Sequence, residues 1–187
     1  TTEAGKLTVN PVTDEVTVTI TEHSAEHVYD GTEKTVTGYD VKSISNKHYT
    51  KDDFTFTGTA EVKGTNVGEY PMNVQASDFT NNSHNFTNVT FIIEDGSLKI
   101  TPKSIVPDGP NTPDDKKTGI KVTKPDDTMY NGKEQKNKPV VRDTKRDVKL
   151  VEDTDYTLSY TAAVNAGTVT VTITGIGNYE GTVNTSY

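Results

Sequence analysis

Apolar and polar residues alternate along most of this chain with the period of two that is typical of β-strands. The run Val-Thr-Val-Thr-Ile occurs at residues 16–20 and again at residues 169–173. Shorter alternating runs lie at 54–57, 98–100 and 156–161. Such runs place apolar side chains on one face and hydroxyl groups on the other, so we expect antiparallel sheets with one wet side.

The pattern predicts an all-β fold made of two tandem small β domains in an elongated arrangement. No window of ordinary helix length has a 3.6-residue period, and only a short helical turn is expected around Ala76–Phe79. An immunoglobulin-like sandwich is favoured over a β-grasp, because crossover helices mark the latter and their signal is weak. We expect the core of the second domain to contain four residues: Leu158, Val169, Val171 and Ile173.

The chain also matches itself when its turns are aligned. Four landmarks recur in the same order: 28–31 with 129–132, 53–56 with 155–158, 66–70 with 165–169, and 85–87 with 178–180. The first pair contains Asp30-Gly31 and Asn131-Gly132, the dipeptides that most strongly favour hairpin turns. Tyr29 and Tyr130 precede them, and we expect each ring to pack beside its turn.

The ends of the copies define the predicted domains. Residues 96–102 close the first copy, and residues 5–11 have the same form, Gly-x-Leu-x-x-x-Pro. We therefore interpret residues 1–13 as the terminal strand of a preceding repeat, pairing onto the first domain or lying along its edge. Residues 14–103 form the first domain, 104–118 a linker rich in Pro, Asp and Lys, and 119–187 a second, C-terminally truncated domain.

Composition narrows the function. The net charge of −8 disfavours nucleic acid as a partner, and the absence of cysteine excludes disulfides and cysteine nucleophiles. No apolar run reaches the length that spans a bilayer, so membrane insertion is not expected.

Candidate chemistry is sparse. His23 and His27 are four apart, but in a strand that spacing is about 13 Å, too far to chelate a metal. Acidic pairs at 52–53, 114–115, 126–127 and 152–153 leave calcium as a minority hypothesis, and an internal Lys–Asn crosslink stays open. We predict no catalytic, cofactor-binding or metal-binding residue, no cofactor and no enzymatic activity. Any exposed aromatic platform for a ligand would come from Tyr39, Tyr49, Tyr160 or Tyr179.

The Tyr29-Asp30-Gly31 motif, the turn at 65–70 and the ending at 95–102 resemble the Tyr-Asp-Gly-type and mucin-binding-type tandem repeats of Gram-positive bacterial surface proteins. The resemblance implies an extracellular, secreted and wall-anchored adhesin. The second copy departs from this pattern, with Asn131 in place of the aspartate.

The leading hypothesis is a non-catalytic stalk, spacer or adhesive module whose partners are neighbouring repeats and an unknown host glycan or protein. The alternative is a carbohydrate-binding or accessory module of a secreted carbohydrate-active enzyme. An exposed aromatic platform within the chain would favour the alternative.

Overall fold

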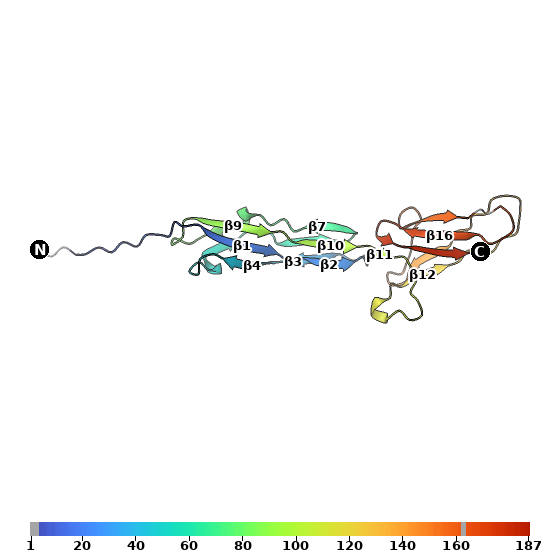
Figure 1. The fold of residues 1–187 in the computed structure, drawn as a ribbon, viewed down its shortest axis with the longest axis horizontal. Coiled ribbons are helices and arrows are strands. Elements are labelled where there is room, and N and C mark those ends of the chain that lie inside the picture. Colours follow the sequence, from blue (N-terminus) through green and yellow to red (C-terminus); the bar gives the residue numbers. More distant parts are fainter. Residues whose placement is uncertain (1–3, 162–163) are drawn as a thin grey trace. The chain divides into compact units, whose positions relative to one another are not determined.

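The computed structural model describes residues 4–161 and 164–187, and this part of the chain is all-β (Figure 1). It contains no α-helix, so the crossover helix that marks a β-grasp is absent from the described residues. Three 3₁₀ turns occur: η1 (Lys51–Asp53), η2 (Ala76–Asp78) and η3 (Asp114–Lys116). The second confirms the helical turn that we predicted around Ala76–Phe79.

The chain contacts divide the molecule into two compact units. The first comprises residues 1–25, 34–64 and 69–99, and the second comprises 26–33, 65–68 and 100–187. The second unit therefore contains two short segments from the first sequence repeat. The domain boundaries proposed from the sequence stay a prediction.

In the first unit, β1 (Val16–Glu22) lies between β4 (Tyr39–Ile44) and β9 (Val89–Glu94), antiparallel to β4 and parallel to β9 (Figure 1). The apolar side chains of β1 are buried and alternate with half-buried threonines, as the sequence pattern predicts. A set of aromatic rings fills the same unit around Phe54, whose ring centroid lies 5.2 Å from that of Phe91 and 5.9 Å from that of Phe79.

The remaining strands of the first half form short ladders. β3 (Lys34–Thr37) pairs with β6 (Glu61–Gly64), and β5 (Phe54–Phe56) pairs with β8 (Phe79–Asn81). A further sheet has the order β2 (Ala25–Val28), β10 (Ser97–Thr101), β7 (Gly68–Pro71).

Small sheets also make up residues 100–161 and 164–187 of the second unit. One has the order β12 (Ile120–Thr123), β13 (Val140–Asp143), β14 (Val148–Lys149), and another the order β15 (Tyr156–Tyr160), β16 (Thr170–Gly175), β18 (Thr182–Ser186). A third pairs β11 (Lys103–Ser104) with β17 (Tyr179–Glu180) in parallel.

The predicted core of this unit is largely confirmed. Val169, Val171 and Ile173 are all buried. Leu158 is only half-buried, so its assignment to the core was wrong. The physical reason is its place on β15, an edge strand with a neighbour on one side only.

The structure shows the internal repeat in its backbone pairing. Val12 bridges Phe86 in parallel, and its N–H donates to the Asn85 carbonyl at 2.8 Å. Lys103 likewise pairs with Tyr179 in parallel, and its N–H donates to the Asn178 carbonyl at 3.0 Å. Because these positions correspond in the sequence alignment, the two copies begin with the same contact.

Two sequence predictions need correction. Asp30-Gly31 does not close a hairpin, because β2 and β3 on either side of it pair with other strands. Asn131-Gly132 lies within the long connection 124–139 between the paired strands β12 and β13, and is no tight hairpin either. Both glycines do adopt positive φ, +79° and +74°, so each dipeptide forms a turn.

The predicted N-terminal strand is also missing from the described residues. Residues 4–11 form no strand, and only Val12 makes a bridge. Leu7 and Val9, which the pattern would place against a sheet, are exposed. Residues 1–3 lie outside the described part of the chain.

Candidate functional site

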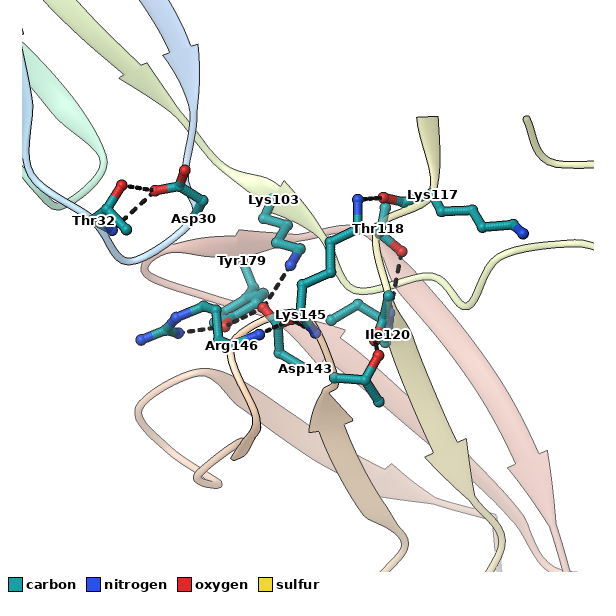
Figure 2. Close-up of polar contacts among 12 residues, drawn as sticks. Asp30, Thr32, Lys103, Lys117, Thr118, Ile120, Asp143, Lys145, Arg146 and Tyr179 are labelled. Atoms are coloured by element: carbon teal, nitrogen blue, oxygen red, sulfur yellow. Dashed lines mark hydrogen bonds and ion pairs between the residues drawn. The ribbon is translucent and has the colours of Figure 1, made fainter. Parts of the chain in front are cut away.

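The strongest concentration of polar contacts in the second unit surrounds Asp143, at the end of β13. Its side chain is completely buried, and its Oδ2 atom lies 2.6 Å from the Nζ atom of Lys103, itself 6% exposed. Oδ1 accepts the backbone N–H groups of Lys145 (3.1 Å) and Arg146 (3.3 Å). Figure 2 shows the Lys103 side chain reaching the Asp143 carboxylate.

Tyr179 of β17 extends this group. Its hydroxyl donates to Asp143 Oδ2 at 3.2 Å and accepts from Arg146 Nη1 at 2.7 Å (Figure 2). We call Lys103, Asp143, Arg146 and Tyr179 the Asp143 cluster. Its carboxylate accepts four hydrogen bonds, so the charge of this buried group is fully satisfied by the protein.

Burial raises the pKa of the Tyr179 hydroxyl to about 12. The Arg146 pKa is also raised, because its hydrogen bond to Tyr179 and the nearby acidic groups outweigh the opposing effect of burial. Both directions keep Tyr179 protonated and Arg146 charged at neutral pH. Neither Tyr179 nor Arg146 is therefore poised to exchange a proton near pH 7.

The Asp143 cluster holds segments of the chain together. Lys103 lies on β11, just after β10 ends the first sequence repeat, whereas Asp143, Arg146 and Tyr179 belong to the second repeat. Backbone hydrogen bonds between the chain at β11 and β17 reinforce this ion pair. For example, the Ile105 N–H donates to the Glu180 carbonyl at 2.7 Å. The chain that leaves the first repeat is thus bound to the second repeat by side chain and backbone.

Tyr29 lies against the same cluster within the second unit. Its ring meets Tyr179 edge to face with centroids 5.7 Å apart, and the Arg146 guanidinium lies 5.0 Å from its centroid. Tyr29 is buried, as we expected from its position beside a turn. Tyr130, its counterpart in the second copy, is 66% exposed, so the same expectation was wrong there.

A cavity of about 520 Å³ adjoins the cluster, and four lysines are among the residues that line it: Lys103, Lys116, Lys117 and Lys145. Lys103 is held by Asp143, Lys117 by Asp114 at 2.5 Å, and Lys145 donates to the Lys117 carbonyl. Asp30, Asp115 and Glu180 line the same cavity. Its charges are mixed and largely paired, which does not make a site for an anion.

The segment 109–117, which the sequence suggested as part of a linker, is closed at its base. Asp108 Oδ1 accepts the Thr118 N–H at 2.6 Å, and Oδ2 accepts the Gly119 N–H at 2.8 Å. These backbone hydrogen bonds lower the pKa of Asp108 against the opposing effect of burial. The two ends of the segment therefore lie side by side.

His23 and His27 belong to different units. His23 Nδ1 lies 2.8 Å from the Thr37 carbonyl and Nε2 lies 3.2 Å from Asp40 Oδ2, and these contacts raise its pKa. His27 lies on β2 and is exposed. Within residues 4–161 and 164–187, no group of three or more His, Asp or Glu side chains could hold a metal ion.

The acidic pairs have local roles. Asp53 caps η1 by accepting the Thr50 N–H at 2.8 Å, and Glu152 pairs with Lys138 at 2.5 Å. Asp114 and Asp127 pair with lysines three positions away. These contacts account for one member of each pair without a metal ion.

The tyrosines considered as ligand platforms are packed. Tyr49 and Tyr179 are buried, and Tyr39 and Tyr160 are half-buried. Tyr39 contacts the rings of Phe56 and Phe79 with centroids 4.9 and 5.3 Å apart. The exposed tyrosine is instead Tyr130.

Sequence reasoning missed Lys103 and Asp143, although a signal existed. In the run 140–143, Val141 and Asp143 share one face of β13, so an apolar side chain at one position predicts burial of the other. A charged residue at a core position of an alternating run requires a partner. Sequence alone could not supply that partner, because Lys103 lies forty residues earlier.

The contact between the Lys103 ammonium and the Asp143 carboxylate would allow one covalent step, the formation of an amide bond between them. It would release water and remove the charge that three other donors satisfy. The arrangement fits a buried ion pair better than a crosslink.

None of the helices in the described part of the chain has the length and apolar character needed to cross a membrane. Comparison of the chain with protein-family models, with curated proteins and with solved structures finds no match.

Proposed function

We propose that this chain is a non-catalytic repeat module of a bacterial cell-surface protein and acts as a spacer that holds consecutive repeats together. The observation that carries the proposal is the buried Lys103–Asp143 pair at 2.6 Å. It fixes the strand that follows the first repeat to the sheet of the second. The resemblance of the Tyr29-Asp30-Gly31 motif to surface-protein repeats supports a location outside the cell.

A spacer requires connections between consecutive repeats that resist separation, and it does not require a reactive group. The Asp143 cluster fits this requirement, because its polar atoms face one another and its carboxylate is buried. Breaking one partner of such a pair leaves an uncompensated charge in the interior, which is strongly destabilising. The network therefore penalises separation of β11 from the rest of the second unit.

The test is single-molecule force spectroscopy on the whole chain, held at its two ends. We expect Lys103→Met to lower the force at which the second unit unfolds, and Lys121→Met, at an exposed lysine of β12, to leave it unchanged. Equal unfolding forces in the Lys103→Met variant and the parent would contradict the proposal. Turnover of a glycan by the chain would also contradict it, and saturable binding of soluble oligosaccharides would support the carbohydrate-module alternative instead.

A further inference from the structure

One loop of the second repeat reproduces the local geometry of a loop of the first, and a second pair of loops corresponds in sequence. In the first repeat, Asp30 Oδ1 accepts the Thr32 N–H at 2.9 Å, and Gly31 has φ +79°. In the second, Asn131 Oδ1 accepts the Lys133 N–H at 2.9 Å, and Gly132 has φ +74°. Residues 65–68 and 164–167 form the other corresponding pair in the sequence alignment.

The two loops of the first repeat are covered within the second unit. Tyr29 packs against Tyr179 and Arg146, as described above. Val67 N–H donates to the Asn178 side-chain oxygen at 2.8 Å, and the Asn178 amide donates to Asn66 Oδ1 at 3.0 Å. Arg146 approaches Gly31 so closely that a Cβ atom there would lie 2.3 Å from its Nε atom.

The two loops of the second repeat keep the tyrosine and the asparagine of the first, as Tyr130 and Asn165, and all their residues are exposed. Met129 is 88% exposed and Tyr130 66% exposed. A Cβ atom at Gly132 would meet only the Tyr130 hydroxyl, at 3.9 Å. Tyr130 and residues 164–167 line one cavity of about 310 Å³.

We infer that the surface formed by residues 129–132 and 164–167 is the docking site for a further copy of the repeat that follows in tandem. In this contact Tyr130 takes the place of Tyr29. Its ring contacts the arginine and the tyrosine of the following copy that correspond to Arg146 and Tyr179. An asparagine in the position of Asn178 accepts a backbone N–H of the loop 164–167. This inference rests on the proposed function, because it names the partner of a repeat module.

The chemistry of the surface formed by residues 129–132 and 164–167 supports a further repeat as the partner. A tyrosine ring offers an arginine a cation–π contact and a second tyrosine an edge-to-face contact, and this chain already makes both at Tyr29. Large exposed apolar side chains gathered beside a cavity are typical of an interaction surface. The chain itself thus contains an occupied version and an uncovered version of one surface.

The experiment uses the whole chain with residues 97–187 fused a second time after Tyr187. Amide hydrogen exchange is measured at residues 129–132 and 165–167 in the parent and in the extended chain. We expect exchange at these loops to slow by about tenfold or more in the extended chain. A matched control carries Arg146→Ala and Asn178→Ala in the appended copy only, and we expect it to restore the parent exchange rates.

Unchanged exchange in the extended chain would overturn the inference. An appended copy that stays unfolded would also overturn the inference. The loops 129–132 and 164–167 would then not support the folding of a following repeat, as the loops of the first repeat do for residues 100–187. Addition of soluble oligosaccharides to the parent supplies the competing outcome. Protection of the same loops by sugar, without protection by the appended repeat, would assign the surface to a glycan and contradict the proposed function as well.

Discussion

Asp143 and Glu22 are acids in the interior of the second and first units, and each is satisfied in a different way. Glu22 is 3% exposed and accepts two backbone hydrogen bonds, from Val74 at 2.5 Å and from Gly96 at 2.6 Å. Asp143 accepts from a lysine, a tyrosine and two backbone groups. An ionised carboxylate is costly to bury without such partners, so each position tolerates few replacements.

The Lys103–Asp143 pair gives the first prediction. Lys103→Met leaves Asp143 buried without its cation, and we expect a loss of about 3–5 kcal/mol in the free energy of unfolding of the second unit. Lys121→Met should cost no more than about 0.5 kcal/mol, because that lysine is exposed. Urea denaturation followed by circular dichroism measures both.

A double variant sharpens this test. Lys103→Met combined with Asp143→Asn should cost less than the sum of the two single changes, because the second change removes the charge that the first leaves unpaired. Additive losses would show that the two side chains do not stabilise each other. The intact mass of the parent should show no loss of water, as expected for an ion pair without a crosslink.

The buried tyrosines give a prediction for alkaline pH. The pKa values of Tyr49 and Tyr179 are raised to about 12, in both cases chiefly by burial. Their folded pKa lies above the unfolded value of about 10, so their stabilising effect is complete below pH 10 and is lost as the pH rises through the folded value. We therefore expect stability to fall between about pH 10 and 12.

Unfolding midpoints in urea across this pH range measure the effect. Tyr179→Phe removes one of the two hydroxyls whose pKa is raised to about 12 and should flatten the pH dependence, even though it lowers stability at neutral pH by loss of two hydrogen bonds. A variant with an unaltered slope would show that Tyr179 does not contribute to it.

At the scale of elements, alternation predicted which face of a strand is buried but not which strands are neighbours. The runs at 16–20 and 169–173 have the predicted burial pattern, since their alternation is local. The parallel pairing of β1 with β9 joins residues more than seventy positions apart, and no local pattern encodes it. The Asp30-Gly31 turn was correctly placed, yet its flanking strands take partners from elsewhere.

The register of β16 provides the element-scale prediction. Val171 is completely buried and lies opposite Tyr160 and Thr185, whereas Thr172 has its side chain on the other face. Val171→Asp should unfold the second unit, because it places an unpaired charge in the core. Thr172→Asp should be mild. Similar denaturation curves for the two variants would mean that the strand register is wrong.

At the scale of the whole molecule, the repeat was visible in its turns, and the structure adds the contacts that the turns serve. Val12 with Phe86 and Lys103 with Tyr179 are the same parallel bridge in the two copies. The sequence could not show that one Tyr-x-Gly loop is covered and the other exposed, because the cover comes from Arg146 and Tyr179, far away in the chain. Equivalent sequence positions thus have different environments.

This difference can be measured with one pair of glycine substitutions. An alanine at positive φ costs about 1 kcal/mol at either position, because both backbones are left-handed. At Gly31 the new methyl group also collides with Arg146, which must leave the ring of Tyr29, at a further cost of about 0.5–1 kcal/mol. Gly31→Ala should therefore lower the free energy of unfolding of the second unit clearly more than Gly132→Ala does.

Combining each substitution with Arg146→Ala identifies the cause. The gap in unfolding free energy between the two glycine variants should close once the guanidinium is gone. A gap that persists without Arg146 would mean that the collision with the guanidinium is not what makes Gly31 the more sensitive position, and that its loop is not held by the contact described here.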